Sequence, residues 1–256
     1  MTPPSPPAGG TPPAELPDLT LRYADHEDGV VDVHLPGGSL PPGAATPLVV
    51  YVHGGFWRSA YDRRHARPLA RALAEAGAVV ASVEYRRVGP DAAGGWPTTG
   101  DDVRRAVDAL PGLLAGVGVR TGPLRLVGHS AGGHLVLWLA ATGVRAERVV
   151  PLAPVCDLAE AGRRHLGDDA TADLMGDLDP AVADPMVLLH DTPAPSDRPV
   201  ATVVHGDGDD VVPLALSEGL VAAHPWIDLE VVGCDHMDVI DPGSVAWPVV
   251  RRVVLG

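Results

Sequence analysis

The chain has 256 residues and 46% of them are hydrophobic, which is enough to bury the core of one sizeable α/β domain. Its formal net charge of -14, without a dense basic cluster, argues against nucleic acid or an anionic membrane as a partner. Cys156 and Cys234 are the only cysteines, and they form neither a Cys-x-x-Cys pair nor a Cys/His cluster. We therefore expect two free thiols, no disulfide framework and no bound metal.

Residues 1–17 are rich in proline and lack both the basic and the apolar segment of a secretory signal. Such a composition cannot bury a core, so it predicts a disordered tail before a single domain that spans residues 18–256. No apolar run in the chain approaches the length of a membrane span. We expect a cytoplasmic protein that does not bind membranes.

Strands and helices alternate along most of the chain. Segments 19–23 and 29–35 alternate apolar and polar residues, as antiparallel edge strands do. The expected buried strands downstream are 48–52, 78–85, 124–127, 148–153, 200–204 and 227–232. The expected helices are 64–77, 101–114 (with Thr99 or Asp101 as its cap), 134–141, 214–223 and 245–255. This order predicts an α/β fold: a mostly parallel sheet with antiparallel N-terminal strands and helices on both faces.

The alternation lapses between residues 157 and 198. We interpret this stretch as a cap-like insertion of short helices, with apolar anchors at Leu158, Leu166, Leu174, Met175, Val187 and Leu188. Because it follows the strand that ends at Ala153, the insertion would overhang the carboxyl edge of the sheet, where ligands bind in such folds. A connecting excursion without any role as a lid explains the same residues equally well.

The segment Gly128-His-Ser-Ala-Gly132 lies between an apolar run and a helical run. Gly-x-Ser-x-Gly in this setting is typical of a nucleophile elbow, a tight turn that presents the serine Oγ above the sheet. The two glycines let neighbouring backbone pass close by, and the helix N-terminus favours negative charge. The pattern predicts Ser130 as a nucleophile. The alternative is an incidental serine in a glycine-rich turn.

A serine nucleophile needs a histidine base and a carboxylate that orients the base. In this kind of fold the chain order is serine, then acid, then histidine. The loop after strand 200–204 offers three carboxylates, and we rank Asp209 before Asp210 and Asp207 because it lies a few residues beyond the strand end. His236 follows the last strand, downstream of both partners, and is the predicted base. The alternative reading of the acidic loop is a solvated turn or a helix cap.

The segment His53-Gly-Gly-Phe-Trp57 directly follows strand 48–52. Acyl transfer passes through an oxyanion that needs hydrogen-bond donors, and glycine-rich backbone can approach such a group closely. We expect backbone N–H donors at Gly55, Phe56 and Ala131, the last being the residue after the nucleophile. By itself the segment is equally compatible with a tight structural turn.

Together these residues resemble an α/β-hydrolase, and the resemblance covers the chain from about residue 19 to residue 255. The residues that carry it are His53-Gly-Gly-Phe-Trp57, Glu84-Tyr-Arg86, Gly128-His-Ser-Ala-Gly-Gly133, His205-Gly-Asp-Gly-Asp-Asp-Val-Val-Pro213 and Asp235-His236. The resemblance is to the esterase/lipase branch with an HGG oxyanion loop, and more narrowly to kynurenine formamidase-like (arylformamidase-like) hydrolases. Phe56 stands where hormone-sensitive-lipase relatives carry a third glycine. The family's acid falls at the fifth position of His-Gly-x-x-Asp, which is Asp209.

The resemblance implies a cofactor-independent serine hydrolase that acts on a small-molecule acyl substrate. N-Formylkynurenine or a related aryl formamide is the first candidate, and a short-chain ester cleaved by a general carboxylesterase is the second. A non-catalytic binding protein with the same fold is the third reading. We expect Trp57 and His129 to contact substrate, with Phe56 and Trp96 as further pocket residues. The sequence leaves a homodimer open.

Overall fold

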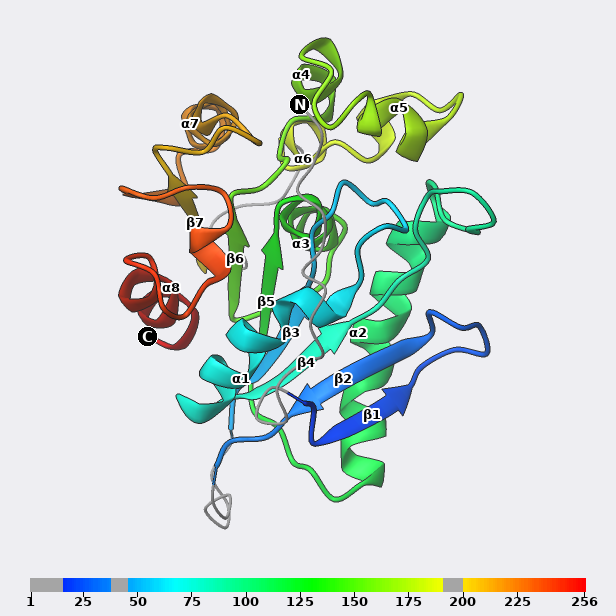
Figure 1. Cartoon of the computed structure of the whole chain (residues 1–256), viewed down its shortest axis with the longest axis vertical. Helices are drawn as coiled ribbons and strands as arrows, with labels where there is room; N and C mark the ends of the chain where they lie inside the picture. The colour runs from blue at the N-terminus through cyan, green and yellow to red at the C-terminus, as the bar shows by residue number, and fades with distance from the viewer. Residues whose placement is uncertain (1–15, 38–45, 191–199) are drawn as a thin grey trace.

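The computed structural model describes residues 16–37, 46–190 and 200–256, and within them eight strands form one sheet (Figure 1). The strand order is β1-β2-β4-β3-β5-β6-β7-β8. Strand β2 runs antiparallel to both of its neighbours, and the pairs from β4 to β8 are parallel. The expected mostly parallel sheet with antiparallel N-terminal strands is confirmed. The strands are β1 (Leu19–Arg22), β2 (Val30–His34), β3 (Leu48–Val52), β4 (Val79–Val83), β5 (Leu124–His129), β6 (Arg148–Leu152), β7 (Val200–Gly206) and β8 (Ile227–Val232).

Helices cover both faces of the sheet (Figure 1). One face carries η2 (Arg63–Ala66), α1 (Arg67–Glu75), η5 (Asp238–Ile240) and α8 (Trp247–Leu255), and the other carries α2 (Thr98–Gly116), α3 (Ala131–Ala141) and α7 (Leu214–Ala223). Side chains alternate across a strand, so the wholly apolar β3 supplies both cores. Val49 and Tyr51 pack in the core under α1 and α8, whereas Val50 and Val52 pack in the core under α2, α3 and α7.

Helix α2 begins at Thr98, before the expected start at residue 101. Its N-cap is Pro97, so neither Thr99 nor Asp101 caps the helix and that expectation was wrong. The Thr99 hydroxyl instead donates to the backbone carbonyl of Arg86 at 2.7 Å. It ties the start of α2 to the segment that follows β4.

The predicted insertion forms α4 (Leu158–Arg163), α5 (Ala170–Met175), η3 (Pro180–Val182) and α6 (Pro185–Leu188). These short helices lie beyond the carboxyl ends of β5 and β6 (Figure 1). Leu158, Leu174 and Met175 are buried as expected, but Val187 is 48% exposed and is not an anchor. Residues 191–198 of the insertion and residues 1–15 of the expected tail lie outside the described residues.

Cys156 and Cys234 are both buried free thiols. In the described ranges, no helix combines the length and the apolar character that crossing a membrane requires.

Candidate active site

Ser130 occupies the turn between β5 and α3, at the carboxyl edge of the sheet. Its backbone dihedrals are φ 55° and ψ -117°, a conformation that side-chain-bearing residues rarely adopt. Hydrogen bonds hold it there: the Ser130 N–H donates to the Leu152 carbonyl at 2.8 Å, and its own carbonyl accepts from the N–H of His134 at 3.1 Å. The strand–turn–helix setting expected for a nucleophile elbow is therefore present, with Ser130 at the strained position.

Glycines let the elbow and the loop after β3 approach each other. A Cβ on Gly132 would collide with the backbone carbonyl of Val52, and a Cβ on Gly128 would collide with that of Gly132. A Cβ on Gly54 would lie 3.0 Å from the Ser130 Cβ and 2.9 Å from the His129 carbonyl oxygen. The HGG loop therefore lies directly against the candidate nucleophile, at a distance that only glycine permits.

Asp209 and His236 form a short hydrogen bond. The loops after β7 and β8 bring His236 Nδ1 to 2.6 Å from Asp209 Oδ2. The other carboxylate oxygen, Oδ1, accepts from the N–H groups of Val211 at 2.9 Å and Val212 at 2.8 Å. Asp207 and Asp210 are exposed, so the structure brings Asp209 rather than its neighbours to the histidine.

The environment keeps the Asp209 carboxyl ionised. Burial by itself would raise the pKa of Asp209, but the hydrogen bonds from His205 and His236 outweigh burial and hold that pKa well below its usual range. A permanently ionised carboxylate can orient the histidine ring and stabilise its charged form.

His129 contacts His236 rather than an open pocket. Its ring lies 4.6 Å from the His236 ring, and its Nε2 donates to the His236 backbone carbonyl at 3.0 Å. The side chain is 2% exposed, and burial lowers the pKa of His129 well below its usual value. A contact between His129 and substrate stays a prediction. His129, next to Ser130 in the chain, fixes the loop that carries His236.

The expected oxyanion loop has an unusual backbone. Gly55, Phe56 and Trp57 have φ values of 109°, 50° and 57°, three left-handed residues in succession. The turn closes with a hydrogen bond of 2.9 Å from the Arg58 N–H to the Gly55 carbonyl. Among the residues that the structure describes, no hydrogen bond uses the N–H of Gly55, Phe56 or Ala131. Their role as oxyanion donors stays a prediction.

A buried carboxylate below this loop was missed by the sequence reasoning. Glu84 Oε1 lies 2.8 Å from Nε2 of His53, whose Nδ1 lies 2.8 Å from the Gly54 carbonyl. Glu84 also accepts from the Arg63 N–H at 3.1 Å. Burial alone would raise the pKa of Glu84, but His53 and Arg87 outweigh burial and lower it to about 2. The quoted segment Glu84-Tyr-Arg86 was the available signal, although nothing in it indicates the partner.

Trp57 belongs to the core. It is 1% exposed, and its ring packs edge-on against the His134 ring with centroids 5.2 Å apart. The indole therefore packs in the core, and a contact between Trp57 and substrate stays a prediction. Trp96 packs edge-on against Trp138 at 5.0 Å. Phe56 is only partly buried, and a Cβ on Gly167 would lie 2.6 Å from its ring, so Phe56 contacts the insertion.

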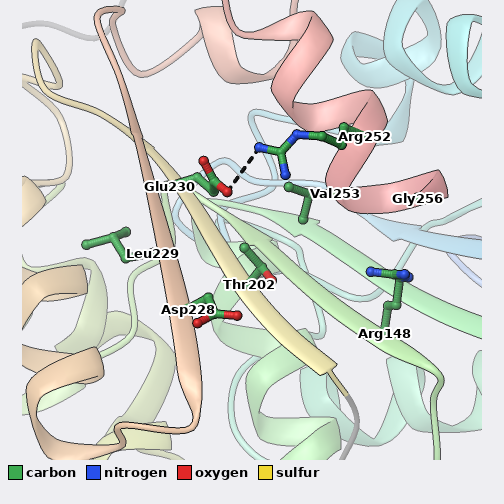
Figure 2. A pocket seen from close by; sticks show the side chains of 8 residues that line it. All are labelled: Arg148, Thr202, Asp228, Leu229, Glu230, Arg252, Val253 and Gly256. Carbon is green, nitrogen blue, oxygen red and sulfur yellow. Dashed lines mark ion pairs between the residues drawn. The ribbon is translucent and has the colours of Figure 1, made fainter.

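A separate pocket of about 410 Å³ lies toward the amino ends of β6, β7 and β8. Figure 2 shows its lining, which includes an ion pair of 3.0 Å between Glu230 and Arg252. Since Ser130 follows the carboxyl end of a parallel strand, this pocket lies at the opposite edge of the sheet from Ser130. In the described segments, no cluster of three or more histidine, cysteine or acidic side chains is arranged to hold a metal.

The sequence model of the BD-FAE family matches residues 31–223. The chain belongs to the BD-FAE family. Kynurenine formamidase of Danio rerio is 34% identical over 124 residues, which are 48% of this chain and 39% of that protein. Esterase LipQ of Mycobacterium tuberculosis is 28% identical over 206 residues, which cover 72% of this chain and 47% of that protein. The BD-FAE chain thus spans less than half the length of these two relatives.

A truncated carbohydrate esterase from gut microbiota has a similar structure, with a TM-score of 0.75 and 19% sequence identity. The match covers 93% of the BD-FAE chain and 95% of the other. Together with the sheet order described above, this likeness establishes the α/β-hydrolase fold.

Proposed function

We propose that this BD-FAE chain is a serine hydrolase of the esterase type, which cleaves a small acyl ester or an aryl formamide through an acyl-enzyme. The observation that carries the proposal is the hydrogen bond of 2.6 Å between His236 Nδ1 and the ionised Asp209. His129, the residue before the strained Ser130, packs its ring 4.6 Å from the His236 ring. Serine, ordered histidine and buried carboxylate are the three parts that nucleophilic acyl transfer needs.

In the proposed first step, His236 Nε2 accepts the proton of Ser130 Oγ as the oxygen attacks the acyl carbonyl carbon. Asp209 stabilises the imidazolium that forms. The carbonyl oxygen becomes an oxyanion and accepts hydrogen bonds from the N–H groups of Gly55, Phe56 and Ala131. Each such donor contributes roughly 3 kcal/mol to lowering the barrier.

His236 then donates the proton to the leaving alcohol or amine as the tetrahedral intermediate collapses to an acyl-enzyme. In the second half of the reaction, His236 removes a proton from water, which attacks the acyl carbon. Collapse of that intermediate returns the proton to Ser130 and releases the acid. No cofactor or metal takes part in this scheme.

The relatives support two substrate classes. The formamidase match has the higher identity, whereas the match to LipQ, named as an esterase, covers more of this chain. We infer that the acyl-transfer chemistry is common to both substrate classes, which differ in the leaving group. Phe56, partly buried between the oxyanion loop and the insertion, is the proposed pocket residue.

A fluorophosphonate probe tests the nucleophile. We expect labelling of the native chain at Ser130 and none of the Ser130→Ala variant. Labelling of both proteins, or of neither, contradicts the proposal and favours a non-catalytic binding protein with this fold.

A substrate panel then tests the leaving group. Formate release from N-formylkynurenine is compared with hydrolysis of p-nitrophenyl esters of increasing acyl length. Turnover of esters without any formamide turnover assigns the chain to general carboxylesterases, and the converse assigns it to formamidases. Retention of wild-type turnover by Ser130→Ala on every substrate overturns both assignments.

A further inference from the structure

Asp209 is contacted by a second histidine besides His236. His205, the second-last residue of β7, places its Nε2 3.2 Å from Asp209 Oδ2 and 2.9 Å from the Val212 carbonyl oxygen. The side chains of His205 and Asp209 are both fully buried.

The hydrogen-bond partners fix where the His205 ring carries a proton. A carbonyl oxygen and an ionised carboxylate can only accept, so Nε2, which faces both, must donate. The other nitrogen, Nδ1, lies 2.7 Å from the hydroxyl of Ser217 on α7, which can donate or accept. Ser217 therefore holds the ring in the orientation in which Nε2–H donates to the Val212 carbonyl at 2.9 Å and Nε2 lies 3.2 Å from Asp209 Oδ2.

The His205 ring is therefore held from two elements. Ser217 contacts Nδ1 from α7, and the Val212 carbonyl in the loop after β7 accepts from Nε2 at 2.9 Å.

With His205 included, both oxygens of the Asp209 carboxylate have two partners. Oδ1 accepts from two backbone N–H groups, and Oδ2 accepts from His236 and lies 3.2 Å from His205 Nε2. Contacts on both oxygens restrict the orientation of the carboxylate, and rigid placement of a catalytic group is worth about 10- to 100-fold in activity where outer partners have been removed.

We propose that His205, held by Ser217, is the positioning residue of the catalytic acid: its Nε2–H fixes the Asp209 carboxylate toward His236 and controls how strongly that carboxylate attracts the His236 proton. This inference rests on the proposed function. His205 touches neither substrate nor Ser130 in this scheme and acts through Asp209.

Removing the His205 donor is expected to change the dependence of kcat/KM on pH. The titratable groups that contact His236 are Asp209 from the loop after β7 and His129 from β5. His205 contacts Asp209, and Asp235 and Asp238 lie on the loop of His236. Without the His205 donor, the pKa of Asp209 rises, and the less neutralised carboxylate holds the His236 proton more tightly. Both effects have the same sign, so the acidic limb of kcat/KM moves to higher pH.

The experiment compares four variants by kcat/KM against pH with p-nitrophenyl acetate as the probe. His205→Leu is expected to lose about tenfold in kcat, with KM nearly unchanged and the acidic limb at higher pH. His205→Gln, whose amide N–H₂ can donate at the Nε2 position, is expected to recover most of the rate. Ser217→Ala, a milder change, is expected to shift the limb in the same direction by less. His224→Gln is the matched control, because His224 is also buried but contacts the Met186 carbonyl instead of the triad.

A His205→Leu protein with the wild-type kcat and the wild-type acidic limb overturns the proposal. An equal loss of kcat in His205→Leu and His205→Gln, with the acidic limb unchanged in both, also overturns it, because that result is the signature of a purely structural role. If His205→Leu does not fold, the position of the acidic limb in Ser217→Ala and His205→Gln is compared with the wild type instead. Ser130→Ala separates the two hypotheses: activity retained there sinks the proposed function, whereas activity lost there with an unshifted His205→Leu sinks only this inference.

Discussion

The pair Glu84–His53 and the pair Asp209–His236 each join a carboxylate to a histidine ring nitrogen, at 2.8 Å and 2.6 Å. They differ in what the second ring nitrogen does. Nδ1 of His53 is occupied by the Gly54 carbonyl, and the ring stacks on Tyr85 with centroids 4.4 Å apart. Among the described residues, Nε2 of His236 makes no hydrogen bond.

This difference separates a structural histidine, His53, from His236, which is free to transfer a proton. A histidine with both nitrogens occupied cannot exchange a proton without losing a contact, so His53 serves to hold the oxyanion loop. A histidine with one nitrogen oriented by a carboxylate and the other available can accept and return a proton. A carboxylate–histidine pair therefore stabilises structure at His53, whereas at Asp209 it orients His236, the proposed base.

The largest expected effect is on the nucleophile. Ser130→Ala should lower kcat by about 10⁴-fold or more, because no covalent intermediate can form. The free energy of unfolding should fall little or even rise, since alanine is smaller at a strained position. Steady-state kinetics and chemical denaturation measure the two quantities. A loss within tenfold means that another nucleophile operates.

Asp209→Asn should come next, with a loss of about 10³- to 10⁴-fold in kcat, because an amide neither stabilises the imidazolium nor fixes its tautomer. Asp207→Asn, on the same loop but exposed, is the matched control and should keep wild-type kinetics. Equal losses in both variants would contradict the assignment of Asp209 as the acid.

Gly54→Ala should lower kcat by about 100-fold, because the added Cβ lies 3.0 Å from the Ser130 Cβ and displaces the elbow or the oxyanion loop. The control is Gly112→Ala: Gly112 lies inside α2 with no atom within 4 Å of an added Cβ. That change should raise the free energy of unfolding by about 0.5–1 kcal/mol with unchanged kinetics. Wild-type activity in Gly54→Ala would show that the close contact is not needed for catalysis.

Glu84→Gln should have the smallest effect on the rate and the largest on stability. Removing one charge from a buried, hydrogen-bonded pair costs about 3 kcal/mol, whereas kcat should fall only as far as the oxyanion loop loosens. Glu147→Gln is the control, since Glu147 is 43% exposed in its ion pair with Arg125 and should change stability by less than about 1 kcal/mol.

The contribution of Glu84 to the free energy of unfolding depends on pH. The pKa of Glu84 is lowered from 4.5 to about 2 in the folded chain, so its contribution is complete above about pH 4.5 and is lost as the pH falls toward about 2. Denaturation curves should show the wild type losing its advantage over Glu84→Gln across this interval. A constant difference between the two proteins would mean that Glu84 is not the ionised partner of His53.

Most of the fold could be read from the sequence because its signals are local. The wholly apolar β3 and β4 predicted strands covered on both faces, and helical spacing predicted α1, α2 and α8 to within a few residues. The exceptions were also physical: α2 begins before its expected cap, and Val187 faces solvent because α6 is too short to bury every apolar side chain.

The candidate site was predictable in part for the same reason. Ser130, Asp209 and His236 each follow a strand, and the carboxyl ends of parallel strands meet at one edge of the sheet. Residues whose role depends on a distant partner were not predictable. Trp57 was expected in the pocket, but three left-handed residues direct its ring into the core.

The sequence by itself determined the order of strands and helices, the elbow at Ser130 and the rank of Asp209 among three neighbouring carboxylates, because each of these depends on spacing within one short segment. Only the tertiary structure decided which groups surround them: Glu84 against His53, His129 against the His236 loop, and His205 with Ser217 against Asp209. Apart from His205 and Asp209, which are four positions apart, these contacts join residues 12 to 107 positions apart in the chain, and packing of the elements brings them together.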